Sequence, residues 1–260
     1  MRRLLALGLV VLVAGCGNSK GKPGEPATRT SAPPPPATTT ATSSSSMTAP
    51  KIAVRVYFVR DGRVAPVRRF VPSTPAVGQA ALDALAAGPT ASERANGLST
   101  AIGLLRLSGL SIRDGEADLG RLTHVSQLAE GQIVYTLTQF PTVRKVRIGD
   151  DVLDRSDLED VTPAILVESP LPGDTVSSPI AVRGTSNTFE ATMRVEIRRG
   201  SDVLVAETVT ASSGSGERGT YEATLDVAAS PGPITLVAFE PSAENGEPIH
   251  QVEIPLTLAG

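Results

Sequence analysis

The chain contains a single cysteine, Cys16, in 260 residues. An intramolecular disulfide and a zinc site built from several cysteines are therefore excluded. Tryptophan is absent and aromatic residues make up only 3% of the chain, so any core must be built from aliphatic side chains. Long basic runs are also absent and the formal net charge is −3, which argues against a nucleic-acid partner.

The position of Cys16 explains why an exported protein has one cysteine. Two arginines precede an uncharged apolar run over residues 4–14. This run is shorter than the roughly 20 residues that span a bilayer, and it is typical of a signal peptide. It ends in the tetrapeptide Val13, Ala14, Gly15 and Cys16. This tetrapeptide resembles the lipobox of bacterial lipoproteins, which implies that residues 1–15 are removed and that Cys16 carries diacylglycerol.

Acylated Cys16 predicts a lipid bilayer as the first partner of the chain. Two acyl chains on one residue are enough for stable anchoring, whereas one chain binds only marginally. We therefore expect the protein on the extracytoplasmic face of the cell membrane. An ordinary signal peptide followed by a chance cysteine is the alternative.

Residues 17–50 are rich in proline, serine and threonine and contain almost no large apolar side chains. Such a segment cannot offset the entropy of ordering, so residues 16–50 are interpreted as a lipidated cysteine followed by a disordered linker. The composition also suits O-linked glycosylation.

Residues 51–155 mix strand and helix patterns. Apolar residues alternate from residue 52 to 58, and Asp61-Gly62 and Asp114-Gly115 each predict a hairpin turn, because these turns need positive φ. A helix is expected from Thr74-Pro75 to about residue 87, a capping box from Thr90 to Glu93, and a longer helix over about residues 123–140. Together they predict an α+β domain with helices on one face of an antiparallel or mixed sheet.

Several segments of this domain carry a family resemblance. They are Val56-Tyr57-Phe58, residues 85–90, residues 97–102 and residues 132–140. Their sequences and order resemble the GerMN domain of spore-germination and sporulation proteins. The resemblance implies an envelope role, in sporulation or germination where spores exist, and it brings no known catalytic residues with it.

Residues 162–260 contain short alternating segments separated by turn signals, with no helical pattern. About seven strands in about 100 residues predict an all-β sandwich held by packing alone. Segments including residues 168–170, 183–185 and 188–191 resemble the immunoglobulin-like domain that follows GerMN in such lipoproteins. Phe189 is expected to plug the core between the two sheets, and Glu190 to tie down a strand end.

Candidate chemistry is sparse. His124 and His250 fall in different predicted domains and share no metal-ligand spacing. The acidic run over residues 150–160 is interpreted as a solvated interdomain connector, with calcium binding or paired catalytic carboxylates as alternatives. The nearest candidates for a basic patch are Arg68-Arg69 and residues 144–147, where strand-surface charges are favoured over a site for anionic wall polymer.

These observations predict a surface-anchored lipoprotein that acts as a non-catalytic binding or scaffold module for peptidoglycan or an envelope protein. No catalytic, metal or cofactor-binding residue is assigned, and no cofactor is expected. Two alternatives remain: an enzyme acting on peptidoglycan or another glycan, and a regulator of an envelope sensor protein.

Overall fold

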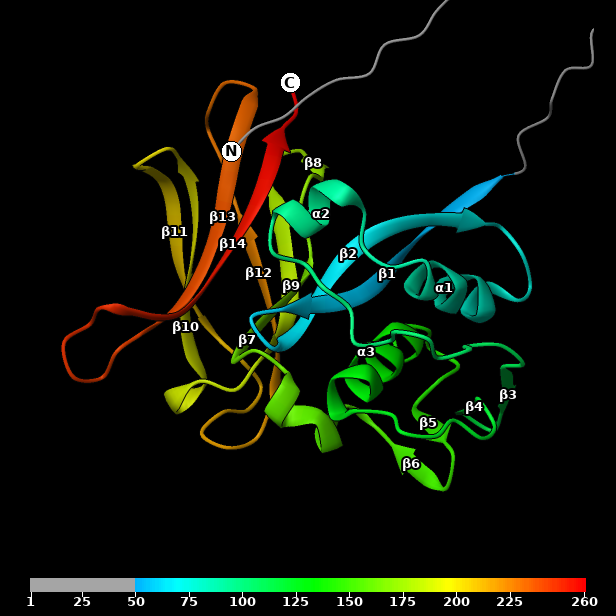
Figure 1. Cartoon of the computed structure of the whole chain (residues 1–260). Helices are drawn as coiled ribbons and strands as arrows, with labels where there is room; N and C mark the ends of the chain where they lie inside the picture. The colour runs from blue at the N-terminus through cyan, green and yellow to red at the C-terminus, as the bar shows by residue number, and fades with distance from the viewer. Residues whose placement is uncertain (1–49) are drawn as a thin grey trace, which may run out of the picture. The chain divides into compact units, whose positions relative to one another are not determined.

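The computed structural model of the chain describes residues 50–260, which fall within one compact unit (Figure 1). The predicted signal peptide, the predicted linker up to residue 49 and the residues of the predicted lipobox, Val13, Ala14, Gly15 and Cys16, lie outside the described residues. Within the described part, none of the helices is both long and apolar enough to cross a membrane.

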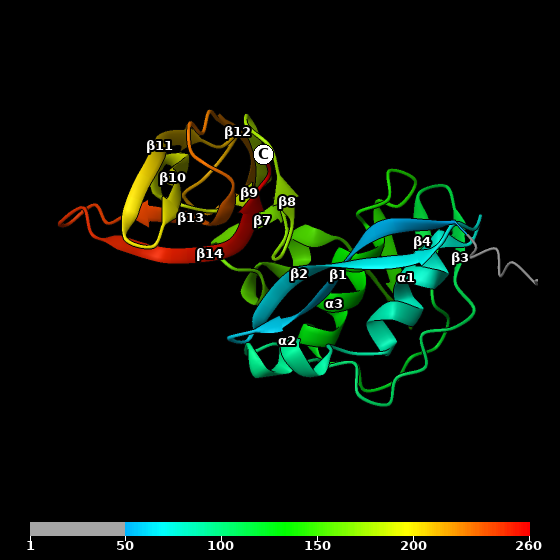
Figure 2. The same cartoon turned by 90° about the horizontal axis from the view of Figure 1, so that it is seen from above.

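The first half of the described chain combines helices with two small sheets. Its elements are β1 (Lys51–Arg60), β2 (Arg63–Pro72), α1 (Val77–Ala86), α2 (Ala91–Ala95), β3 (Ser111–Arg113), β4 (Glu116–Asp118), α3 (Gln127–Leu137), β5 (Lys145–Ile148), β6 (Asp151–Leu153) and the 3₁₀ helix η1 (Arg155–Val161). β1 and β2 form an antiparallel hairpin, and a second sheet has the order β3-β4-β5-β6. Helices α1 and α3 pack on one face of the hairpin (Figure 2). The predicted α+β fold is confirmed.

Local turn and capping signals in this half were reliable. Asp61 and Gly62, at the tip of the β1–β2 hairpin, have φ of 50° and 72°, and Asp114 and Gly115 have φ of 53° and 87°. Thr90 and Glu93 form both hydrogen bonds of a capping box at the start of α2. These features depend only on neighbouring residues, which is why the sequence alone predicts them.

The helix starts differ from those expected. Helix α1 begins at Val77 without a side-chain cap, because the hydroxyl of Thr74 accepts a hydrogen bond from the Ala76 amide instead. Helix α3 begins only after Ser126, whose side chain caps it. His124 has a φ of 57°, so the chain before Ser126 cannot be helical.

Gly131 lies in the middle of α3 because the helix is packed closely there. A Cβ atom at this position would lie 3.0 Å from a methyl of Val161 and 3.1 Å from a methyl of Val64. Glycine costs helical stability relative to alanine, but here it lets α3 approach the hairpin and η1. The helix therefore remains continuous through Gly131.

Side chains of α3 close the outer edge of β1. The side-chain amide of Gln139 both accepts from the Arg55 N–H and donates to the Arg55 carbonyl. Thr136 accepts from the Tyr57 N–H at 3.1 Å, and Gln132 donates to the Tyr57 carbonyl at 2.9 Å. Gln132 and Thr136 lie four residues apart on α3 and Gln139 lies in the turn after it, and together they satisfy backbone groups that a neighbouring strand would otherwise pair. β1 therefore has no open edge along this stretch.

The second half is a sandwich of two sheets. Its elements are β7 (Ile165–Ser169), β8 (Thr175–Val176), β9 (Ile180–Ser186), the 3₁₀ turn η2 (Phe189–Ala191), β10 (Thr192–Arg199), β11 (Asp202–Thr210), β12 (Gly219–Leu225), β13 (Gly232–Pro241) and β14 (Pro248–Leu258). One sheet has the order β11-β10-β13-β14-β8 and the other β12-β9-β7. An aliphatic core fills the space between them. The predicted all-β immunoglobulin-like sandwich is confirmed, with the short β8 as an unpredicted addition.

The expectation that Phe189 plugs this core was wrong. Its side chain is 57% exposed, and the core at this end is closed by residues of the strands themselves. Glu190 and Ala191 both have positive φ and turn the chain sharply at η2. The loop is instead tied down by its backbone, since the Phe189 N–H donates to the buried carboxylate of Glu240 at 2.8 Å.

Candidate functional site at the junction of the two halves

The acidic segment that joins the two halves is folded against the first core. Leu158 and Val161 are 1% and 6% exposed and belong to that core. Asp154 and Asp157 form a capping box at the start of η1. The interpretation of residues 150–160 as a solvated connector therefore holds for the exposed Asp150, Asp151, Asp157 and Asp160, and it misses the apolar anchor of the segment. Leu158 and Val161, three residues apart along η1, face inward.

Strand β7 contributes to both cores. Ile165 and Val167 pack between the sheets of the sandwich, whereas Leu166 packs into the core of the first half. Successive side chains of a strand point to opposite faces, so one edge strand can serve two cores. Gly184 on β9 permits this packing, because a Cβ there would lie 2.0 Å from the Leu166 carbonyl oxygen.

Glu168, the residue after this two-sided stretch, is bound by groups of the first half. The ladder between β7 and β9 shifts register between Val167 and Ser169, which leaves Glu168 outside the ladder. Its Oε1 accepts a hydrogen bond from the hydroxyl of Tyr57 and lies 3.0 Å from Nη1 of Arg155. A carboxylate of the sandwich thus meets a phenol and a guanidinium of the α+β half.

Arg155 is itself held in place by the first half. Its Nε donates to the hydroxyl of Thr138 at 2.8 Å, and its guanidinium carbon lies 4.6 Å from the ring centroid of Tyr135. The Tyr135 ring in turn packs beside the ring of Tyr57, with centroids 5.2 Å apart. The cation is therefore fixed by a hydrogen bond and an aromatic face before it meets Glu168.

Charge and burial set the protonation of this cluster. Burial opposes ionisation of Glu168, but Arg155, Tyr57 and Arg55 outweigh it and lower the pKa of Glu168 below its ordinary value. Burial, together with the negative charge of Glu168, raises the pKa of Tyr57. At neutral pH Glu168 is ionised and Tyr57 is a neutral donor, so the cluster is suited to holding the halves together and offers no general base at Tyr57.

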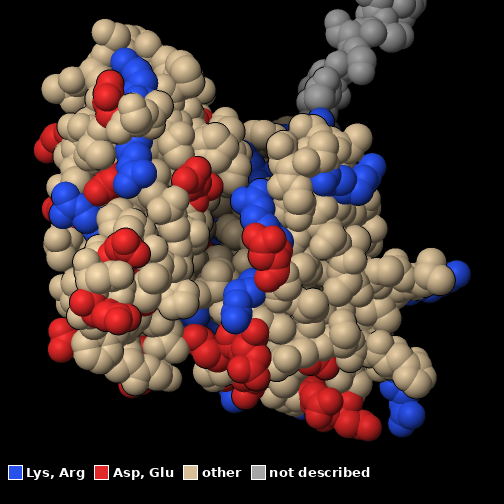
Figure 3. Space-filling model, turned by 60° about the vertical axis from the view of Figure 1, so that its left-hand side comes forward, with Lys and Arg blue, Asp and Glu red and all other residues tan. Residues whose placement is uncertain are grey.

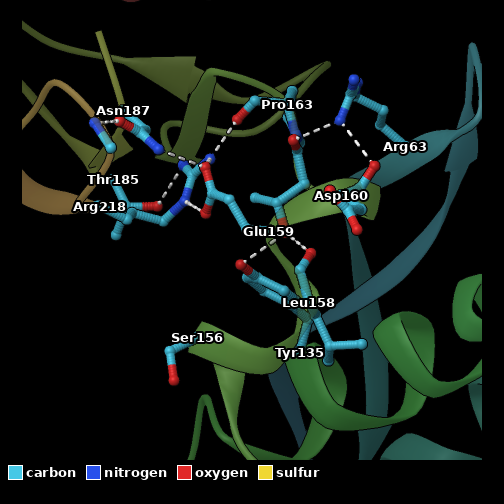
Figure 4. A network of polar contacts seen from close by, with 12 residues as sticks. Arg63, Tyr135, Ser156, Leu158, Glu159, Asp160, Pro163, Thr185, Asn187 and Arg218 are labelled. Carbon is cyan, nitrogen blue, oxygen red and sulfur yellow. Dashed lines mark hydrogen bonds and ion pairs between the residues drawn. The ribbon is translucent and has the colours of Figure 1, made fainter.

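A second set of contacts joins η1 to the loop before β12 (Figure 4). Arg218 donates from Nε to Oε2 of Glu159 at 2.8 Å and from Nη2 to Oε1 at 2.9 Å. The same Nη2 donates to the Pro163 carbonyl, and the side-chain amide of Asn187 donates to Glu159. Burial opposes the charge of Glu159, but Arg218 and Asn187 outweigh it and lower the pKa of Glu159.

Strand β2 supplies a third set. Nη1 of Arg63 donates to the carbonyls of Asp160 and Thr162 at 2.8 and 3.0 Å (Figure 4). Nε of Arg68 donates to Oδ1 of Asp174 at 2.8 Å, next to β8. The junction is therefore held along β2, η1 and β7 rather than at a single point.

A cleft of about 850 Å³ opens beside this junction. Its walls come from residues 64–68 of β2, residues 163–167 around the start of β7, and residues 251–255 of β14. Aliphatic side chains share the lining with Arg60, Arg63 and Glu253. In Figure 3 the surface is hollowed between the two halves, with charges of both signs along the rim. Its size is in the range of pockets that bind ligands.

A second, more open hollow of about 580 Å³ lies where Arg155 and Glu168 meet β9 and β12. Hydroxyl groups of both strands line it, including those of Thr185 and Thr220, which are directly opposite each other in the ladder. The Glu168 cluster therefore borders solvent on one side and the packed junction on the other.

The histidines and acidic groups highlighted by the sequence form no metal centre in the described residues. His124 is exposed before α3, and Nε2 of His250 lies 3.8 Å from Glu240. Among residues 50–260, three or more histidine, aspartate or glutamate side chains nowhere gather in a way that could hold a metal ion.

The basic residues proposed for anionic polymer are engaged by neighbouring groups. Arg68 pairs with Asp174 and Arg69 pairs with Glu93. In the other cluster, Arg147 pairs with Glu116 at 2.8 Å, Lys145 lies 3.8 Å from Asp154, and Arg144 donates to a backbone carbonyl. These charges support the strand-surface interpretation.

The carboxyl groups do not form the pair expected of a glycan hydrolase in either hollow. Such a pair needs one acid with a raised pKa facing an ionised partner across the substrate. Burial and the charge of Asp151 raise the pKa of Glu130, but Glu130 lines neither the cleft nor the second hollow. In the cleft, the hydrogen bond from Arg69 lowers the pKa of Glu93.

Sequence reasoning missed the residues that build the junction. Tyr57 and Glu168 appeared only as parts of family-like segments, and Arg218 drew no attention. The one available signal was Glu168 itself, an acidic residue directly after three apolar strand residues. Such a charge close to a core needs a partner, although the sequence does not say which one.

The chain matches two protein families. Residues 55–149 match the family described as "Sporulation and spore germination", and residues 164–247 match the "Immunoglobulin-like domain of bacterial spore germination". Both resemblances drawn from the sequence are thereby confirmed. No curated protein matches the chain.

Two solved structures are similar to parts of the chain. The tandem GerMN domains of the sporulation protein GerM from Bacillus subtilis share 24% identity over 38% of this chain, with a TM-score of 0.34. This chain spans 38% of the length of that chain. The fibronectin(III)-like modules of Clostridium thermocellum CbhA share 18% identity over 36% of this chain and 93% of that chain, with a TM-score of 0.24.

Proposed function

We propose that this protein is a lipid-anchored binding module of the cell envelope. Its two halves match the sporulation and spore germination family and the immunoglobulin-like domain of bacterial spore germination. It binds peptidoglycan or an envelope protein and performs no chemistry of its own. In spore-forming hosts this role serves sporulation or germination.

The locked junction is the observation that carries this proposal. Glu168, Glu159 and Asp174 each bind an arginine across the two halves, and Leu166 of β7 packs into the opposite core. Two domains held at several points present their surfaces in a fixed arrangement, which lowers the entropy lost on binding. Such preorganisation suits recognition of an extended partner, because contacts on both halves form together.

The membrane anchor follows from the lipobox at Cys16. A signal peptide ending in this tetrapeptide, followed by a long linker rich in proline and serine, places the folded part outside the cytosol at some distance from the bilayer. An anchored module of this kind can reach cell wall or a neighbouring membrane protein without leaving the membrane.

The non-catalytic role is supported by the chemistry of the hollows. Glu168 and Glu159, whose pKa values are lowered, are engaged by arginines at the junction. Tyr57 is held neutral by burial. These groups join the two halves. A hydrolase would instead need a carboxyl group kept protonated at its substrate.

Binding to purified cell walls tests the proposal against the enzyme alternative. Residues 17–260, the mature chain without its acylated cysteine, would be incubated with walls and sedimented, and the supernatant would be analysed by mass spectrometry for released fragments. A binding module sediments or remains soluble without releasing fragments. Release of muropeptides that increases with time and protein concentration would contradict it.

Crosslinking in intact cells identifies the partner. The full chain would be crosslinked and its adducts identified by mass spectrometry. Recovery of wall fragments supports a peptidoglycan ligand, and recovery of one defined membrane protein supports an envelope-protein partner, including the sensor alternative. Recovery of neither, together with no sedimentation, would contradict a binding role.

A further inference from the structure

The cleft is bounded by strand edges that lack a neighbouring strand. In the β1–β2 hairpin, the backbone groups of Arg55 and Tyr57 point away from β2, toward α3. Residues opposite them in an antiparallel ladder point away from β1 in turn. These residues are Arg68 and Pro66, so their backbone groups point away from β1, and both residues line the cleft.

The same alternation shows which backbone groups of β14 point away from its neighbour β13. The Gly173 N–H donates to the Pro255 carbonyl and the Thr257 N–H donates to the Asp174 carbonyl, both on the side away from β13. Glu253 lies two residues before Pro255 in the strand, so its N–H and carbonyl also point away from β13. β8 pairs only with Thr257 and its neighbour, which leaves the edge at Glu253 uncovered where it lines the cleft.

Two arginines of the cleft form no ion pair among the described residues, although Asp61, Glu93 and Glu253 also line it. Of the three arginines that line it, Arg68 pairs with Asp174, whereas Arg60 and Arg63 contact only backbone carbonyls among the described residues. Nε of Arg60 is buried and has no hydrogen-bond partner. Because this atom is shielded from solvent, a ligand carboxylate would bind the terminal guanidinium nitrogens of Arg60 instead, through charge-assisted hydrogen bonds.

We propose that the cleft binds an extended acidic peptide, which adds as a strand at the edges of β2 and β14 and places a carboxylate at Arg60. Strand addition supplies backbone hydrogen bonds, and pockets along the edge select alternate side chains. The aliphatic lining from β2, β7 and β14 receives the apolar side chains. Pro66 has no N–H, so one hydrogen-bond donor is missing from the β2 edge. The peptide therefore pairs with the carbonyl groups of β2 and with the backbone of Glu253 on β14.

This inference rests on the proposed binding function and specifies its ligand. A glycan strand would use the cleft differently, because it has no peptide backbone to pair with a strand edge. An acidic linear segment of an envelope protein has the required chemistry.

Selection from a phage library of random linear peptides tests it directly. Residues 17–260 would be the target, and the enriched peptides would be synthesised and titrated by fluorescence anisotropy. We expect peptides that share an acidic residue within a β-branched stretch. A selection without enrichment, or enrichment of basic peptides, would overturn the proposal.

Variants of the cleft locate the binding. Glu253→Pro removes the outward N–H and leaves the ladder to β13 intact, and Arg60→Glu reverses the charge. Each should weaken binding by about tenfold, as expected for one lost charged or backbone hydrogen bond. Glu253→Thr removes the same carboxylate but keeps the N–H, so it is the matched control for the proline variant and should bind at least as tightly as the wild type. Arg106→Glu reverses an exposed charge outside the cleft and should bind as the wild type does. Equal binding by all four variants would overturn the proposal.

N-methylation of alternate residues of the selected peptide gives a test that leaves the protein unchanged. It removes peptide N–H groups, so binding should be lost if strand addition holds the peptide. Unchanged binding would contradict strand addition. The peptide selection uses purified protein and is independent of the crosslinking in cells. If the selection fails while crosslinking recovers an envelope partner, the acidic-peptide proposal is overturned and the binding function stands. If crosslinking fails, the binding function itself is overturned.

Discussion

Arg218 of the immunoglobulin-like half donates two parallel hydrogen bonds to the carboxylate of Glu159 in the segment that leaves the α+β half. This bidentate geometry is the strongest form of an arginine–carboxylate contact. Because Arg218 also donates to the Pro163 carbonyl, it fixes the backbone of the segment that joins the halves. The acidic segment therefore supplies one side of the contact that joins the two halves.

Replacement of Glu168 by glutamine should destabilise the protein. Arg155 would keep its half-buried position without a counter-charge, which costs about 2–3 kcal/mol in a setting that water partly screens. Urea denaturation of residues 17–260 measures the loss. The control is Glu222→Gln, which removes an exposed ion pair with Arg183 and should leave the unfolding midpoint unchanged. Equal stability of Glu168→Gln and wild type would contradict the role given to this cluster.

The contribution of Glu168 should depend on pH. Its folded pKa lies below that of a free glutamate, about 4.3. The stability that it contributes is therefore fully present above this pH and is lost as the pH falls through the folded pKa. The difference in unfolding free energy between wild type and Glu168→Gln should stay constant from neutral pH to about pH 5 and shrink below it. A difference that persists unchanged at pH 3 would contradict the assignment.

Gln132 should be essential for stability even though it is polar. Replacement by leucine leaves the Tyr57 carbonyl and the Ala101 N–H, both bound by the Gln132 side chain, without partners in the core. The expected cost is about 2–4 kcal/mol. Gln127→Leu changes an exposed residue of the same helix and serves as the control in thermal unfolding. Loss of stability in both variants alike would point to the helix in general and not to the capped edge.

Lipid attachment should depend on Cys16 alone. Metabolic labelling with palmitate should mark the full chain in cells and place it in the membrane fraction. Cys16→Ser should be unlabelled and leave that fraction. Labelling of the serine variant, or an unlabelled wild-type protein, would contradict the lipobox.

The sequence predicted those parts of the fold that local interactions determine. The Asp61-Gly62 turn, the capping box at Thr90 and the alternating strands of the sandwich each depend on residues a few positions apart. The same reasoning failed for Phe189, because an apolar side chain in a strand-rich segment usually points inward, and only the positive φ at Glu190 and Ala191 turns it outward.

The candidate site was beyond reach of the sequence because its contacts join distant residues. Tyr57 meets Glu168 only after the hairpin, α3 and η1 have packed. The buried anchor of the acidic run was missed, since charge counts do not reveal that Leu158 and Val161 reach the core. Gln132 and Thr136 on α3, with Gln139 just after it, bind the edge of β1, but polar side chains in such positions have no meaning until the strand edge that they cap is known.

The fixed arrangement of the two halves is the central claim, and the distance between spin labels measures it. Labels would be attached at Ala86→Cys in α1 and Thr224→Cys in β12, both exposed, in residues 17–260, which contain no native cysteine. Pulsed electron paramagnetic resonance should give one narrow distance distribution, and this should broaden when Arg218→Ala and Glu168→Gln are introduced together. A broad or multiple distribution in the otherwise unaltered protein would contradict the claim.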